Sequence, residues 1–400
     1  MSNTTLPPLR LKKNEERRLR AGHQWVYSNE VDTDKTPLSA FQPGQPVEVR
    51  DSRDAVIGTG YINPHTLICA RLVSRDPAHP FSASLLVHRL NVALALREML
   101  YDKPYYRLVY GDSDGLPGLV VDRYDTVLVV QITTAGMEIM KDEVLATLEK
   151  VIKPTAVLLR NDSSVRDMEG LSSYVTTVLG TVPERVALEE NGVHFEAPLL
   201  TGQKTGWFYD QRDNRARIAR YARGKRVLDV FSYLGGFGIQ AAAAGAESVL
   251  CVDSSATALE GVHANAALNR LQDNVTTLQG DAFDALKQLR EQREHYDIVI
   301  VDPPAFIKRK KDMKEGVQAY RRINQMAMQV LAKDGILMSC SCSFHMTRDS
   351  LLEQMLGASR HIDRSLQILE QGHQGPDHPV HPAITETDYL KAFIGRVLPA

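Results

Sequence analysis

The second half of the chain alternates short apolar segments with segments of helical periodicity, and this alternation constrains the fold more than any other feature. The expected strands lie at residues 226–232, 248–253, 275–280, 297–302, 336–341, 366–369 and 391–397. The helices between them are expected to begin near Gly236, Ala256, Ala282, Lys314 and Arg348. Because strand–helix alternation is typical of parallel sheets covered on both faces, the sequence predicts an α/β fold with a doubly wound, Rossmann-like sheet from about residue 205.

The residues before this sheet predict two smaller domains. Alternating β-rich segments separated by turn residues lie at 45–50, 56–61 and 66–74. With a basic helix near the N-terminus, they predict a small β-barrel. A long periodic helix then leads into an α+β region that ends in a hairpin at Asn191-Gly192, a dipeptide that suits a type I′ turn. We therefore expect domains at residues 1–75, 76–200 and 201–400.

Composition excludes several classes of protein. No apolar run reaches the roughly 20 residues that cross a bilayer, and the N-terminus lacks the apolar core of a secretory signal. The 4 cysteines are too few and too scattered for a disulfide framework, and they lack the paired spacing of a zinc site. We therefore expect a cytoplasmic protein without a metal or a membrane partner. The oligomeric state stays open, with a homodimer as one candidate.

The formal net charge of −2 argues against a chain that is basic throughout, but two segments concentrate positive charge. Residues 10–20 and residues 308–314 each carry an excess of Lys and Arg over acidic residues. Such a run is often only a solvated face. The second run directly follows a candidate catalytic loop, so we expect Lys308, Arg309 and Lys311 to contact the phosphate backbone of a nucleic acid.

Acidic residues stand where successive strands of the predicted sheet end, which is where open α/β sheets bind ligands. Asp229 precedes a glycine-rich loop and could accept hydrogen bonds from an ammonium group. Asp253 is placed to hold a ribose diol, and Asp281 to accept from an adenine amino group. A single acid in such a place is often only a helix N-cap. Three of them after a glycine loop predict S-adenosylmethionine, with contacts from Asp229, Phe231, Tyr233, Gly235, Gly236, Asp253 and Asp281.

The segment Asp302-Pro303-Pro304-Ala305-Phe306 indicates a ligand site more specifically than the three acids do. Two prolines after an apolar strand fix the backbone, so the Asp302 side chain is expected to face the pocket and contact both cofactor and substrate. Phe306 is then free to stack on a planar base. The alternative is a rigid turn that only ends the strand. The segment resembles the Asp/Asn-Pro-Pro motif of nucleic-acid methyltransferases.

The cysteines bear on which atom would be methylated. Cys69 and Cys251 lie in apolar strands and are expected to be core residues. Cys340 and Cys342 share one strand, and Cys342 is nearer its open carboxyl end. C5 of cytosine is a poor nucleophile until a thiolate adds to C6, so C5 methylation needs a cysteine. Methylation of an exocyclic amine does not, and would leave Cys342 structural.

With these motifs, the chain resembles the bacterial 23S ribosomal RNA cytosine-C5 methyltransferases of the large-subunit type I group over nearly its whole length. The resemblance rests on residues 229–238, Asp253, Gly280-Asp281, 302–306 and 341–343, together with 114–119, 205–212 and 377–380. It implies an N-terminal PUA domain, a central α+β domain and a C-terminal Rossmann-like methyltransferase domain. It also implies that four residues of one segment pack over the cofactor, namely Phe208, Asp210, Gln211 and Arg212.

One departure from the family pattern affects the mechanism. Many RNA cytosine-C5 enzymes carry a second cysteine after the prolines, where it helps to release product, whereas this chain has Ala305 and Phe306. The base that removes the C5 proton is therefore open. The resemblance predicts ribosomal RNA as partner, Cys342 as nucleophile and Asp302 as the residue that stabilises the reacting ring. The alternatives are methylation at another base position, a non-catalytic S-adenosylmethionine-binding assembly factor, and a small-molecule methyltransferase.

Overall fold

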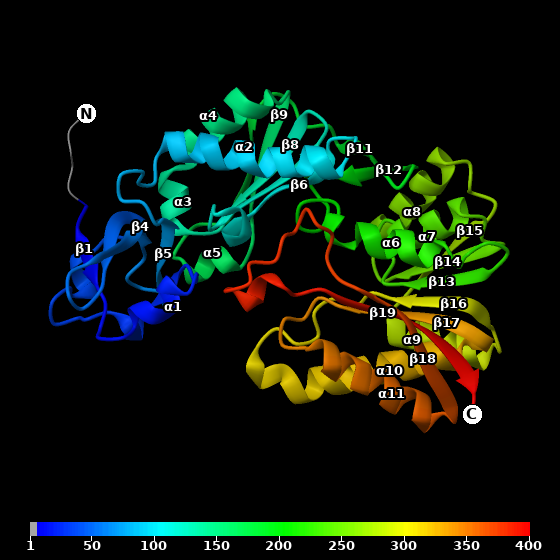
Figure 1. Ribbon diagram of the computed structural model, residues 1–400. Coiled ribbons are helices and arrows are strands. Elements are labelled where there is room, and N and C mark those ends of the chain that lie inside the picture. Colours follow the sequence, from blue (N-terminus) through cyan, green and yellow to red (C-terminus); the bar gives the residue numbers. More distant parts are fainter. Residues whose placement is uncertain (1–5) are drawn as a thin grey trace. The chain divides into compact units, whose positions relative to one another are not determined.

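The structure is a computed structural model that describes residues 6–400, and these form two compact units (Figure 1). The first unit runs to Val186 and also takes in Pro198–Trp207 and Pro376–Thr387. The second unit comprises Ala187–Ala197, Phe208–Gly375 and Asp388–Ala400. The chain thus crosses between the units several times, and a single boundary near residue 200 does not describe it. The expected boundary at residue 75 falls between two sheets of the first unit.

The first sheet of the first unit has the strand order β1-β3-β4-β5-β2. Its elements are β1 (Pro8–Arg10), α1 (Glu16–Arg20), β2 (Trp25–Tyr27), β3 (Gln45–Arg50), β4 (Val56–Ile62) and β5 (Ile68–Ser74). The three longer strands match the sequence prediction. The prediction missed β1 and β2 because a strand of three residues is too short to display alternation.

The second sheet of this unit has the order β10-β9-β8-β7-β6 and packs with α2 and α4 around its own core. Its elements are α2 (Ala83–Leu100), β6 (Tyr105–Tyr110), β7 (Leu119–Tyr124), β8 (Val127–Ile132), α3 (Ala135–Ile139), α4 (Lys141–Ile152), β9 (Ala156–Asn161), α5 (Val165–Met168) and β10 (Tyr174–Leu179). The segment before residue 152 forms two helices, α3 and α4, because the backbone leaves helical geometry at Met140.

The second unit is built on a seven-stranded sheet of order β15-β14-β13-β16-β17-β19-β18. Its strands are β13 (Arg226–Val230), β14 (Ser248–Asp253), β15 (Val275–Gln279), β16 (Tyr296–Val301), β17 (Leu331–Ser341), β18 (Arg364–Gly372) and β19 (Lys391–Pro399). The strands from β15 to β17 are parallel, whereas β19 runs antiparallel between β17 and β18. The strand order reverses between β13 and β16, which is where doubly wound sheets bind their ligands.

Helices connect the strands from β13 to β18, and a hairpin and one further helix precede β13. The helices are α6 (Arg212–Ala219), α7 (Gly236–Ala243), α8 (Ala256–Leu268), α9 (Ala282–Glu291), α10 (Met313–Gln329) and α11 (Arg348–His361). The hairpin consists of β11 (Arg185–Glu190) and β12 (Val193–Pro198). Asn191 and Gly192 at its turn both have positive φ, 54° and 78°, which confirms the expected turn chemistry.

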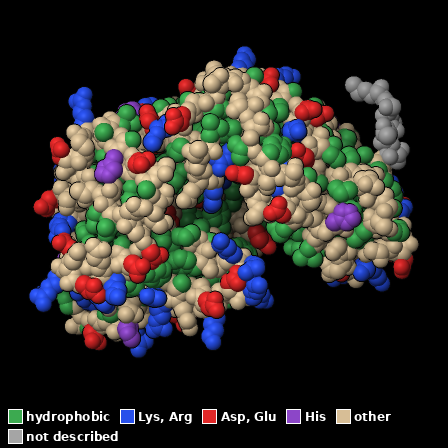
Figure 2. All heavy atoms as spheres, turned by 180° about the vertical axis from the view of Figure 1, so that it is seen from behind, with side chains coloured by type: hydrophobic (Ala, Val, Ile, Leu, Met, Phe, Trp, Pro, Cys, Tyr) green, Lys and Arg blue, Asp and Glu red, His purple; other side chains and the backbone are tan. Residues whose placement is uncertain are grey.

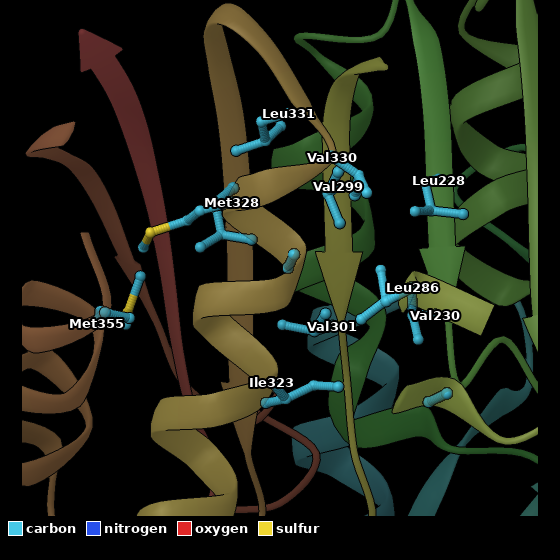
Figure 3. Close-up of a cluster of buried hydrophobic side chains, with 14 of the residues drawn as sticks. Leu228, Val230, Leu286, Val299, Val301, Ile323, Met328, Val330, Leu331 and Met355 are labelled. Carbon is cyan, nitrogen blue, oxygen red and sulfur yellow. The ribbon is translucent and has the colours of Figure 1, made fainter. Parts of the chain in front are cut away.

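A continuous apolar core holds the sheet of the second unit in place (Figure 3). Side chains of β13 and β16 point toward apolar side chains of α9, α10 and α11. Each fully buried aliphatic side chain in such a core contributes about 1.5–3 kcal/mol. The residues at its centre are Leu228, Val230, Leu286, Val299, Val301, Ile323, Met328 and Met355. This core fixes the carboxyl ends of β13 and β16 beside each other.

The surface agrees with the small net charge. On the face drawn in Figure 2, basic and acidic side chains are interspersed. Within residues 6–400, no helix combines the length and the apolar character that a membrane span requires.

Candidate active site

The loop that follows β13 has an unusual backbone. Phe231, Tyr233 and Gly235 all have positive φ, at 66°, 49° and 79°. Positive φ is costly for side chains such as Phe and Tyr, and it persists where the surroundings impose it, often at ligand sites. Gly235 is the left-handed residue before α7, so glycine there has a conformational reason.

Two neighbouring glycines allow close packing beneath this loop. A Cβ atom on Gly236 would lie 2.7 Å from Nε of Arg215, and one on Gly238 would lie 2.7 Å from Sγ of Cys251. The glycine-rich stretch thus lets α7 sit directly against β14. These contacts explain the two glycines structurally.

Asp229 lies wholly buried under the loop. Its Oδ2 accepts a hydrogen bond from the Gly238 amide at 2.9 Å, whereas its Oδ1 is buried without a hydrogen-bond partner among the described residues. Burial raises the pKa of Asp229 to about 7, against the lowering effects of the Gly238 amide and Arg215. A buried oxygen without a donor fits a cationic ligand group such as the ammonium of S-adenosylmethionine.

Asp253 and Asp281 stand at the ends of the next two strands and both bind backbone amides. Asp253 accepts from the Tyr233 amide and the Ser255 amide, each at 2.9 Å, and so fastens the loop to β14. Asp281 is exposed and caps α9 through Oδ1. The helix-capping alternative thus describes Asp281, while each carboxylate keeps further acceptor capacity for a diol or an amino group.

Asp302 follows β16, on the other side of the strand-order reversal from Asp229. Nε2 of Gln211 donates to its Oδ1 at 2.9 Å, and Oε1 of Gln211 accepts from Asn214 at 2.7 Å. Burial, followed by the negative charge of Asp210, raises the pKa of Asp302 to about 7. Gln211 thereby orients Asp302, a positioning role for Gln211 and Asn214 that sequence reasoning did not identify.

The segment from Phe208 to Arg212 lies beside the loop after β13. The ring of Phe208 meets that of Tyr233 edge-on with centroids 5.5 Å apart, and Tyr389 donates to Asp210 at 2.5 Å. Arg212 is directed at the buried carboxylate of Glu190, with Nε to Oε2 at 3.6 Å.

Glu190 was not identified from the sequence because nothing in its own segment distinguishes it. It is 2% exposed and comes from the hairpin strand β11. In addition to the contact with Arg212, its Oε1 accepts hydrogen bonds from Nη1 of Arg215 at 2.7 Å and from Nε2 of Gln240 at 2.9 Å. These contacts join the hairpin to α6 and α7 and fix two arginines near the acidic groups.

Cys342 stands just beyond the end of β17 and is the most accessible of the four thiols, being partly exposed while the others are buried. Its Sγ lies 4.0 Å from the carbonyl oxygen of Pro303. Burial raises the pKa values of the Cys340 and Cys251 thiols well above the ordinary range and that of Cys69 to about 12. A buried thiol with a raised pKa is a poor nucleophile, so geometry favours Cys342 over Cys340.

Tyr320 of α10 organises the backbone around Cys342. Its hydroxyl accepts a hydrogen bond from Ser341 and pairs with the hydroxyl of Ser343, both at 2.9 Å. Ser343 in turn accepts from the Ile307 amide at 3.2 Å. One buried tyrosine therefore ties the end of β17 to the loop after Asp302, which fixes the nucleophile candidate against that loop.

Phe306 and the basic run occupy different environments. The Phe306 ring packs among aromatic neighbours, with centroids 4.9 Å from Tyr320 and 6.2 Å from Phe283, so it is less free than the sequence suggested. Lys308, Arg309 and Lys311 are all exposed, and Arg309 also forms an ion pair with Asp312 at 3.2 Å. In residues 6–400, no group of three or more His, Cys, Asp or Glu side chains could hold a metal ion.

Comparison with known proteins agrees with this arrangement. The profile of the S-adenosylmethionine-dependent methyltransferase family matches residues 125–396, and that of the PUA-like domain matches residues 9–75. The ribosomal RNA large subunit methyltransferases I of Erwinia tasmaniensis and Shewanella frigidimarina are each 36% identical to the chain. The alignments cover 97% of the chain and 98% and 99% of the two relatives.

Solved structures support the fold. SMU.776, a methyltransferase complexed with SAH, superposes with a TM-score of 0.84 over 98% of the chain and 100% of its own, at 22% identity. A SAM-dependent methyltransferase from Streptococcus mutans gives a TM-score of 0.82 with the same coverage and identity. The expected Rossmann-like fold, PUA-like domain and S-adenosylmethionine cofactor are thereby confirmed. The chain belongs to the S-adenosylmethionine-dependent methyltransferases, in the family that contains the ribosomal RNA large subunit methyltransferases I.

Proposed function

We propose that this protein methylates C5 of a cytosine in large-subunit ribosomal RNA through a covalent bond between Cys342 and C6. The observation that carries the proposal is the position of the partly exposed Cys342 thiol, 4.0 Å from the Pro303 carbonyl and next to Asp302 along that loop. The names of the 36% identical relatives support ribosomal RNA as the substrate. They do not specify the base or the atom.

Cofactor binding is assigned to the loop after β13 and the acids around it. The unpartnered Oδ1 of Asp229 would take the ammonium, while Asp253 and Asp281 offer acceptors to the ribose and the adenine. When bound, S-adenosylmethionine supplies an electrophilic methyl group. The positive φ values of Phe231 and Tyr233 support this assignment, because such backbone strain persists mostly at functional sites.

The chemistry proposed for the protein side chains starts with the thiolate of Cys342. Its sulfur forms a bond to C6, and the electron pair of the C5–C6 double bond makes C5 nucleophilic. Asp302 hydrogen-bonds N3 and N4 and stabilises the charge that develops on the ring. After C5 is methylated, a base removes the C5 proton, the double bond re-forms and the sulfur–C6 bond breaks.

RNA binding is assigned to two parts of the chain. PUA-like residues 9–75 would hold RNA, and exposed Lys308 and Lys311 would contact phosphates near the site. The target base must leave its stack to reach Cys342, at a cost of a few kcal/mol. The cytoplasm, where ribosomal RNA is available, is the proposed location.

A second candidate is methylation of an exocyclic base amine. The segment Asp302-Pro303-Pro304-Ala305-Phe306 favours it, because this segment resembles the motif that amine methyltransferases use and lacks a second cysteine. In that reaction Asp302 and the Pro303 carbonyl would orient the amine, and Cys342 would be structural.

A trapping experiment separates the two candidates. Large-subunit RNA that carries 5-fluorocytosine should form a covalent adduct with the wild-type protein, because fluorine cannot leave C5 as a proton does. The adduct should survive denaturing electrophoresis and require S-adenosylmethionine. Mapping of 5-methylcytosine in large-subunit RNA, from cells with and without the protein, locates the target. A methylated amine with no adduct would decide for the second candidate.

A further inference from the structure

A lysine is buried next to the end of the strand that leads to Cys342. Lys391 begins β19, is only 5% exposed and pairs in register with Ser341 of β17. Its Nζ donates to the carbonyl oxygens of Ser343 and Tyr389, each at 2.7 Å. These bonds hold the amino group next to the backbone that carries the nucleophile candidate.

This placement is costly for a charged side chain. Neither hydrogen-bond acceptor has a formal charge. A buried ammonium without an anionic partner destabilises the fold, and this cost is offset if a negative charge forms beside it during function. Burial lowers the pKa of Lys391 to about 8, while negative charge on Asp388 and on Cys342 opposes this lowering. The geometry that links Nζ to Cys342 is its hydrogen bond to the carbonyl of Ser343, the next residue in the chain.

We propose that Lys391 is a positioning residue that stabilises the thiolate of Cys342. The S–H bond of Cys342 breaks, the proton leaves to water, the electron pair stays on sulfur, and the Lys391 ammonium offsets the new negative charge. The Ser343 carbonyl keeps Nζ beside the residue that follows Cys342, so the charge is held in place. This inference rests on the proposed function only in taking Cys342 as the reacting group.

Other charged groups around the pair do not replace this role. Arg348, at the start of α11, donates to the Gly372 carbonyl at 3.0 Å. Asp302 and Asp388 are acidic and would disfavour a thiolate. Tyr320 is bound to Ser341 and Ser343. Lys391 is thus a buried cation that is placed to stabilise negative charge on the Cys342 thiolate.

The test measures the reactivity of the thiol without RNA or cofactor. Alkylation of Cys342 in the full-length protein by iodoacetamide, followed by mass spectrometry of its peptide across pH, gives the apparent pKa of this thiol. For the wild type we expect a value below the roughly 8.5 of a free cysteine. A wild-type value at or above 8.5 overturns the proposal and needs no variant.

Variants give the dependence on charge. Lys391→Met should slow alkylation at pH 7 by about tenfold, a rise of about one pKa unit, and Lys391→Arg should restore most of the rate. Lys333→Met is the control, because Lys333 is exposed near the start of β17, the strand that leads to Cys342, and lies at the opposite end from that thiol, so its loss should leave the profile unchanged. Binding of S-adenosylmethionine by calorimetry reports whether each variant is folded. An unchanged profile in folded Lys391→Met contradicts the proposal.

The adduct assay keeps this inference apart from the proposed function. A lysine-dependent, lowered thiol pKa without a 5-fluorocytosine adduct supports the inference and counts against cytosine-C5 chemistry. An adduct that forms equally well in wild type and Lys391→Met supports that chemistry and contradicts the inference.

Discussion

The Sγ atom of Cys342 lies 4.0 Å from the carbonyl oxygen of Pro303. This contact joins the end of β17 to the loop that follows β16, across adjacent parallel strands. Pro303 directly follows Asp302, a carboxyl group whose pKa is raised to about 7. The thiol of Cys342 and the segment that carries Asp302 therefore lie at the same edge of the sheet.

Replacement of the two strand-end cysteines should separate chemistry from packing. Cys342→Ala should abolish turnover and the 5-fluorocytosine adduct, yet retain cofactor binding. Cys340→Ala should stay active and lose about 1 kcal/mol of unfolding free energy, because Cys340 is a buried thiol in β17. Methylation assays and chemical denaturation measure both effects. Near-normal methylation by Cys342→Ala would mean that the reaction does not use this thiol.

Asp253 should matter to the cofactor for two reasons. Asp253→Ala would remove the acceptor proposed for the ribose, and it removes the anchor of the Tyr233 amide, so the loop after β13 should loosen. We expect the binding of S-adenosylmethionine to weaken by about 1–3 kcal/mol in calorimetry. Asp273→Ala, an exposed acid in the turn before β15, serves as the control. Equal affinities of the two variants for S-adenosylmethionine would show that Asp253 does not contribute to the cofactor site.

Affinity for S-adenosylmethionine should rise with pH between about 6 and 8. The pKa values of Asp229 and Asp302 are raised to about 7 in the free protein, mainly by burial, so both carboxyl groups gain protons below pH 7. A cationic ligand favours the ionised forms, and each group that must lose a proton weakens binding by up to about tenfold per pH unit below its pKa.

Calorimetry in buffers of different ionisation enthalpy counts the released protons. SAH lacks the sulfonium charge and should show a weaker pH dependence. The same pKa shifts imply that, without ligand, the unfolding free energy falls as pH rises from about 4 to 7, because ionised buried carboxylates destabilise the fold. Affinity that is flat across pH 6–8 would show that neither carboxyl group titrates on binding.

The basic run should contribute to RNA affinity through its lysines more than through its arginine. Lys308 and Lys311 are exposed, whereas Arg309 already pairs with Asp312. Lys308→Gln combined with Lys311→Gln should lower the slope of log affinity against log salt by up to about two, while Arg309→Gln changes it less. Filter binding at several salt concentrations measures the slopes. Identical slopes for the wild type and the double variant would show that these lysines form a solvated surface without phosphate contacts.

Local sequence was sufficient to predict those structural features that depend on residues close together in the chain. Strand–helix alternation predicted the sheet from Arg226 onward, the glycines predicted the loop before α7, and Asn191-Gly192 predicted a turn with positive φ. Each of these features depends on steric preferences or on side-chain periodicity within about ten residues, which the sequence displays directly.

Tertiary structure alone decided which distant side chains meet. Gln211 reaches Asp302 across 91 positions, and Lys391 reaches the Ser343 carbonyl across 48, through the antiparallel insertion of β19 beside β17. Glu190 enters the second unit from a hairpin that the sequence assigned to the preceding domain. The family resemblance marks the segment of Gln211 but not its contact with Asp302, and no local pattern marks Lys391 or Glu190, because a buried Lys or Glu is stable only through partners supplied by the complete fold.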